Sequence, residues 1–90
     1  MVPTLHIRGH GASHYQARIF RGQELIGEPS VHTSVEQAIA AHAAGAGLAG
    51  VTGFHLWYEG CTVGAVPLTQ MRDQAHSLAQ RLIVLTAVMR

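Results

Sequence analysis

The sequence predicts an α+β fold, a two-layer sandwich in which an antiparallel sheet of about five strands has two helices on one face. Three observations support this prediction. Two segments have the alternating pattern and turn of a β-hairpin, two others have helical periodicity, and the connections are too short for most strands to pair in parallel. The expected order is β-β-β-α-β-β-α, in a single domain over residues 1–90.

The first three strands are expected at residues 4–8, 15–21 and 24–28. Residues 4–8 alternate between polar and apolar side chains. A two-residue turn at Gly22-Gln23 would place Arg21 opposite Glu24, as an ion pair in a hairpin. The same register pairs Phe20 with Leu25 and Ile19 with Ile26. Pro29 then weakens any continuation of the third strand.

The first helix is expected to begin after residues 33–34. Ser34 and Gln37 have the spacing of a capping box, in which the two residues bond each other's backbone amides. Apolar residues and one histidine then recur on a single helical face, and Gly45 and Gly47 end the helix. That face comprises Val35, Ala38, Ile39, His42 and Ala46.

A second hairpin is expected at residues 54–58 and 61–66, around the turn Glu59-Gly60. In this register Tyr58 faces Cys61 on an apolar side of the hairpin. Two further pairs lie on the same side, Leu56 with Val63 and Phe54 with Ala65. His55 and Trp57 then lie on the opposite side.

The last helix is expected to run from about Thr69 to Met89, with a seam of apolar residues at alternating spacings of three and four. Its final two turns are apolar nearly all round, and a small domain can cover only one side of a helix. We therefore expect a homodimer through this helix, with Trp57, the one tryptophan, as a further anchor. The candidate partner-binding residues are Trp57, Leu78, Leu82, Leu85, Val88 and Met89.

The composition indicates the source and the cellular compartment of the protein. Six arginines oppose five acids, for a net charge of +1, and lysine and asparagine are absent, as in a GC-rich bacterial genome. A single cysteine, Cys61, cannot form an intramolecular disulfide, which is typical of a reducing compartment. No apolar run reaches the 18–20 residues that a bilayer requires, and the first residues lack the pattern of a secretory signal. We therefore expect a cytoplasmic protein.

No motif predicts catalysis, a cofactor or a metal site. Residues 45–50 match G-x-G-x-x-G, but they follow a helix and precede a strand, the reverse of a dinucleotide-binding loop. His6, His10 and His14 recur every four residues, but in a strand that spacing separates them by about 13 Å, too far to share an ion. We therefore expect a non-enzymatic protein that acts through self-association or partner binding.

Two alternatives stay open. The first is a small-ligand, metal-binding or catalytic domain that uses His6, Arg8, His55 and Trp57 on one side of the sheet. The second is a nucleic-acid adaptor, because residues 15–48 resemble the hairpin and following helix of a double-stranded RNA-binding domain. That family has a basic cluster at the start of this helix, whereas residues 34–37 here carry no positive charge. Nucleic acid is therefore not the favoured partner.

Overall fold

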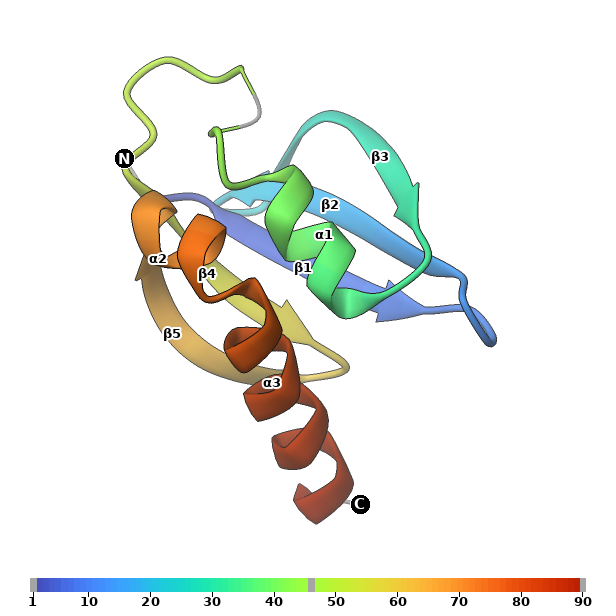
Figure 1. Ribbon diagram of the computed structural model, residues 1–90. Helices are drawn as coiled ribbons and strands as arrows, with labels where there is room; N and C mark the ends of the chain where they lie inside the picture. The colour runs from blue at the N-terminus through green and yellow to red at the C-terminus, as the bar shows by residue number, and fades with distance from the viewer. Residues whose placement is uncertain (1, 46, 90) are drawn as a thin grey trace.

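The chain folds into an α+β structure of five strands and three helices (Figure 1). The computed structural model describes residues 2–45 and 47–89, and for Met89 it describes the backbone alone. The elements in chain order are β1 (Thr4–Gly9), β2 (Tyr15–Arg21), β3 (Glu24–His32), α1 (Val35–Ala41), β4 (Gly53–Tyr58), β5 (Cys61–Pro67), α2 (Leu68–Asp73) and α3 (Ala75–Met89).

The sheet has the strand order β3-β2-β1-β4-β5, and β1 and β4 at its centre are parallel. The other neighbouring strands are antiparallel, so the prediction of a purely antiparallel sheet was wrong at this pair. The reason is α1, which carries the chain from the edge strand β3 back to the centre of the sheet. Parallel neighbours need such a crossover, and a helix is its usual form.

The first hairpin has the predicted register. Arg21 pairs with Glu24, and the two apolar pairs that follow also match the prediction. However, β3 continues through Pro29 to His32, beyond the predicted end. Because β3 is an edge strand, Pro29 removes no hydrogen bond to a second neighbour, and the register shift in the β2–β3 ladder accommodates the extra residues.

The second hairpin begins in the predicted register and then shifts by one residue. Tyr58 pairs with Cys61 as predicted, but the ladder shifts between Trp57 and Leu56. Val66 therefore lies opposite Phe54, where Ala65 was predicted. The cause is a β-bulge beside Gly64, whose φ of 84° is a conformation that glycine adopts without strain.

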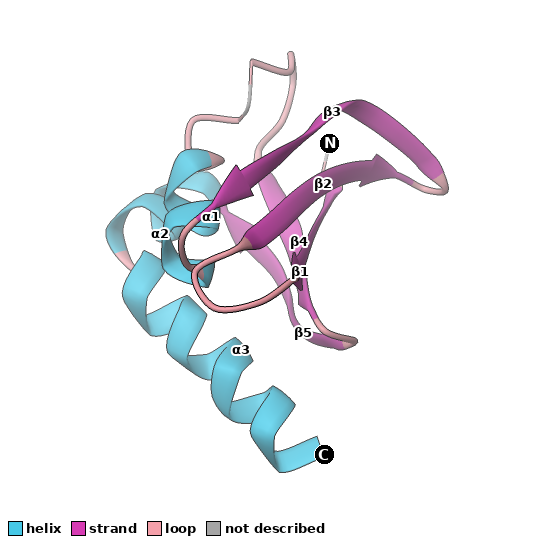
Figure 2. Ribbon diagram, turned by 90° about the vertical axis from the view of Figure 1, so that its right-hand side faces the viewer, coloured by secondary structure: helices cyan, strands magenta, loops and turns pink. Residues whose placement is uncertain are grey.

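All three helices cover one face of the sheet and leave the other without a helix (Figure 2). Half of the predicted capping box of α1 is present, since the Ser34 hydroxyl accepts a hydrogen bond of 3.0 Å from the amide of Gln37. The Gln37 side chain accepts from the amide of Thr33 and not from that of Ser34. The core between the two layers is apolar. Its largest fully buried side chains are Leu5, Ile7, Ile39, Phe54, Leu56, Met71, Leu78 and Leu82.

The last helical segment is two helices rather than one. The break is at Gln74, whose backbone leaves the helical region and whose amide donates to the carbonyl of Gln70. The predicted seam packs against the chain's own sheet, and Leu78 and Leu82 are 1% and 0% exposed. These two residues are therefore core residues and cannot contact a partner. Within the described part of the chain, no helix has the length and apolarity to span a membrane.

Replacement of Gly53 by alanine is expected to destabilise the fold. A Cβ atom at this position would overlap the backbone carbonyl of Val66, where β4 and β5 approach closely. We expect a loss of about 1–3 kcal/mol in the free energy of unfolding, measured by urea denaturation. Gly9→Ala is the control, because its Cβ would lie 3.5 Å from the Tyr15 ring, an ordinary contact. Equal stability of the two variants would contradict the close approach.

Candidate functional site

Two surfaces of the described chain lack a covering layer. One is the face of the sheet away from the helices, which we call the open face. The other is the outer side of the last turns of α3, which we call the α3 stripe and which comprises Arg81, Val84, Leu85 and Val88. The two surfaces lie on opposite sides of the sheet.

The centre of the open face is a row of three side chains from neighbouring strands. His6 of β1 is paired with Arg18 of β2 on one side and with Trp57 of β4 on the other. The next row is formed in the same way by Phe20, Thr4 and His55. The predicted grouping of His6, His55 and Trp57 is therefore correct. Arg18 and Phe20 also belong to this face, although the sequence analysis did not include them among the site residues.

The aromatic side chains of the open face are only partly buried. Phe20 and His6 form an edge-to-face contact, with their ring centroids 6.3 Å apart and their planes at 87°. Trp57 lies across the β1–β4 pairing from His6 and is half-buried. Rings at these positions would normally pack beneath a second layer, but no helix covers them here.

Arginine side chains lie beside the aromatic rings. Arg18 is half-buried and donates a hydrogen bond of 3.0 Å from Nη2 to Oε1 of Gln16, which holds the guanidinium near the sheet. Arg8 lies further along β1 and is exposed. Arg8 also lines a small hollow with His6, Glu59 and Gly60, with a volume of about 230 Å³. The open face is therefore both aromatic and basic.

One acid borders this hollow and is already engaged. The Oε1 atom of Glu59 accepts a hydrogen bond of 2.8 Å from the backbone amide of Gly9. This bond holds the carboxylate at the rim of the hollow.

The pKa of His6 is lowered from its ordinary value of 6.5. Partial burial is the main cause, because it disfavours the charged ring. The positive charges of Arg18 and Arg8 lower it further, and Glu59 partly offsets them. Burial and the two arginines therefore both favour the neutral form of the His6 ring.

The three regularly spaced histidines do not gather around a common point. His6 is in β1, whereas His10 and His14 belong to the following turn, where their ring centroids are 6.1 Å apart. Over residues 2–45 and 47–89, the structure contains no group of three His, Cys, Asp or Glu side chains placed to hold a metal ion. His55 is exposed on the open face, while Cys61 pairs with Tyr58 on the core side and is half-buried.

The end of α3 extends past the sheet, as Figure 1 shows for the red end of the helix. Val88 is 74% exposed, Val84 56% and Leu85 38%. Beside them is a hollow of about 360 Å³, lined by Gln80, Arg81, Val84 and Leu85. Of the predicted partner-binding residues, Leu85 and Val88 are therefore at the surface, and the side chain of Met89 lies outside the described residues.

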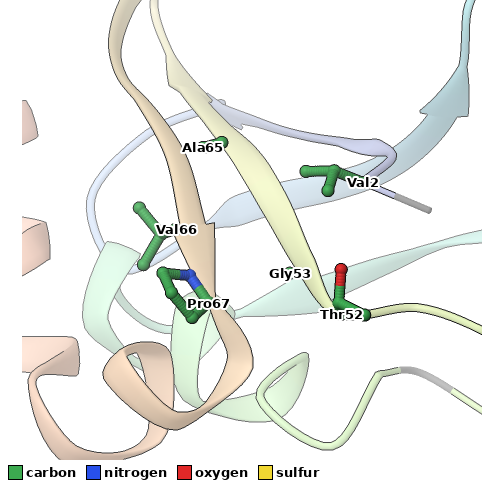
Figure 3. A pocket seen from close by; sticks show the side chains of 6 residues that line it. All are labelled: Val2, Thr52, Gly53, Ala65, Val66 and Pro67. Atoms are coloured by element: carbon green, nitrogen blue, oxygen red, sulfur yellow. The ribbon is translucent and has the colours of Figure 1, made fainter.

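A third hollow, of about 260 Å³, lies where the amino-terminal segment meets β4 and β5 (Figure 3). Its lining carries no ionisable side chain, so it offers no acid, base or metal ligand. The residues are Val2, Thr52, Gly53, Ala65, Val66 and Pro67.

Comparison with known proteins does not assign a family. No protein-family model matches the chain, and neither the curated proteins nor the solved structures include a match. The function must therefore be inferred from the open face and the α3 stripe.

The lowered pKa values of two histidines predict that the protein loses stability as the pH falls below 6.5. Partial burial is the main cause of the lowered pKa of His32, and electrostatic repulsion from His42 adds to it. Burial is also the main cause of the lowered pKa of His6. Below pH 6.5 the unfolded chain binds protons at these positions more readily than the folded chain, so stability is fully present above 6.5 and falls below it.

This loss is measured by denaturant titrations between pH 7.5 and pH 5. His6→Gln and His32→Gln should each reduce the pH slope of the free energy of unfolding, by at most about one proton per site. An unchanged slope in both variants would contradict this account.

Proposed function

We propose that this protein acts through self-association, as a non-enzymatic homodimer whose subunits meet along the α3 stripe. The observation that carries the proposal is the exposure of Val84, Leu85 and Val88 near the end of α3. The chain's own sheet reaches only Leu85, which lines a hollow with Cys61 and Thr62 of β5. A second molecule would cover the apolar side chains that the sheet leaves exposed.

The spacing of the stripe suits a helix-to-helix contact. Arg81, Val84, Leu85 and Val88 follow the positions i, i+3, i+4 and i+7, which lie on one side of an α-helix. Arg81 is the one charged member of the stripe. Its guanidinium can extend to the rim of the contact while its methylene groups pack against the partner helix. The stripe contains no acid that would be buried without a partner.

Several features of the stripe favour a second copy as the partner. Val88 is the most exposed of the large apolar side chains described, and the hollow lined by Arg81, Val84 and Leu85 lies one turn before it. A twofold axis near Leu85 with antiparallel helices would place Val88 of each copy at the hollow of the other. One surface then supplies both the protruding side chain and the cavity, which a symmetric interface requires.

The size of the stripe favours a reversible dimer. If the contact removes about 600 Å² of apolar surface from water, it contributes about 15 kcal/mol before the entropy of association and ordering is subtracted. That cost is about 4–15 kcal/mol, so the net is at most about 11 kcal/mol and we expect a dissociation constant on the order of tens of micromolar.

We propose the cytoplasm as the compartment, since the lone Cys61 suits a reducing environment.

Sedimentation velocity between 5 and 500 µM tests the proposed dimer. The unmodified protein should shift from monomer to dimer across this range, and Val84→Glu should weaken association more than tenfold because it buries an unpaired charge. Ile83→Glu is the matched control, with the same charge at an exposed β-branched position of the same helix that is not three or four residues from any member of the stripe. A wild-type protein that stays monomeric at 500 µM, or equal effects of the two variants, would overturn the proposal.

A further inference from the structure

We propose that the open face binds single-stranded nucleic acid, with bases stacked on Phe20 and Trp57 and phosphates held by Arg8 and Arg18. This site differs from the helix start at residues 34–37, where the sequence showed no positive charge. The proposal is also independent of the dimer, because the α3 stripe lies on the other side of the sheet.

The aromatic rings of the open face provide two separate stacking positions. Phe20 and Trp57 are two strands and one row apart, because Phe20 pairs with Thr4 and Trp57 with His6. With strands about 4.8 Å apart and a rise of about 3.3 Å per residue, the two backbone positions are about 12 Å from each other. A single base cannot contact both rings, so the arrangement suits successive bases of a strand rather than a mononucleotide.

The cations lie where the backbone of such a strand would pass. Arg18 pairs with His6 across the β1–β2 ladder and lies two residues before Phe20 in β2. Its guanidinium is held by Gln16. Arg8 lies two residues beyond His6 on the same face. Both guanidiniums have free donors for phosphate oxygens, and Glu59 is held at the rim by the Gly9 amide.

The same polar groups argue against other occupants. An apolar protein surface would remove Arg18 and His6 from water without supplying a negative charge, which is costly. A duplex keeps its bases stacked inside and cannot use the rings of a sheet face. Single strands expose both the base planes and the phosphates that this face can bind.

The position of His6 makes the binding depend on pH. The charged groups that face it are Arg18 from β2, Arg8 from its own strand and Glu59 from the turn after β4, while its β4 neighbour Trp57 carries no charge. A phosphate near the two arginines favours the protonated ring. Binding should therefore tighten as the pH falls from 7.5 to 6.

Fluorescence anisotropy with labelled twelve-nucleotide strands, oligo(dT) and oligo(U), tests the proposal at 50 mM salt. Both strands should bind saturably, and the intrinsic fluorescence of Trp57 should change on binding. Two phosphate contacts predict a slope of about −1.4 in log affinity against log salt, and Arg18→Gln should reduce its magnitude by about 0.7.

Paired variants distinguish base stacking on Trp57 from non-specific electrostatic attraction. Trp57→Leu should weaken binding at least about fivefold while Trp57→Phe retains it, because leucine preserves apolar bulk but not the ring. Arg72→Gln, on the helical side of the molecule, is the charge control and should leave affinity unchanged. Thermal unfolding of each variant confirms that it is folded.

Three outcomes would overturn the proposal. The first is no saturable binding up to 100 µM of either strand. The second is binding that base-free polyphosphate displaces equally well and that Trp57→Leu leaves unchanged, which would show attraction to charge alone. The third is binding of an acidic aromatic peptide in place of the strands. Val84→Glu distinguishes this proposal from the dimer, since it should weaken association more than tenfold and leave strand binding in place.

Discussion

The parallel pairing of β1 with β4 is the contact on which the rest of the structure depends. It joins the three-stranded antiparallel unit β1-β2-β3 to the β4–β5 hairpin, and α1 and a connecting loop lie between them in the chain. On the helical side it brings Leu5 and Ile7 against Leu56, so that one continuous core forms. On the other side it brings His6 beside Trp57. Without this pairing, the β4–β5 hairpin would be a two-stranded unit too small to be stable alone.

A single sheet with a single helical layer leaves two kinds of surface to solvent. The helices cover one face of the sheet. The other face carries the side chains that alternate with the core residues along each strand, including Phe20 and Arg18. The helical layer is also longer than the sheet, so the end of α3 exposes Val84 and Val88. We propose that the end of α3 binds a copy of the same chain and that the open face binds a charged and aromatic ligand. Their separation allows both to be occupied together.

Local patterns predicted the elements well, because each depends on residues close in sequence. The register from Arg21 to Glu24 and the Ser34 cap of α1 are both present. The parallel pairing could not be predicted, since it joins residues about fifty positions apart and depends on where α1 returns the chain. Arg18 and Phe20 were not assigned to the site because the register of β1 against β2 was not predicted. The seam through Leu78 and Leu82 was predicted correctly as apolar but assigned to a partner, because the sequence does not show how far the sheet reaches beneath the helix.

Amide chemical shifts recorded from 10 µM to 1 mM test the central claim most directly, which is that the end of α3 is the surface available to a second copy. The account predicts concentration-dependent shifts confined to α3 from Arg81 onward and to the neighbouring turn at Gly60, where Leu85 lines a hollow with Cys61 and Thr62. The open face should keep its shifts. Spectra that do not change with concentration, or changes centred on Trp57 and His6, would contradict the claim.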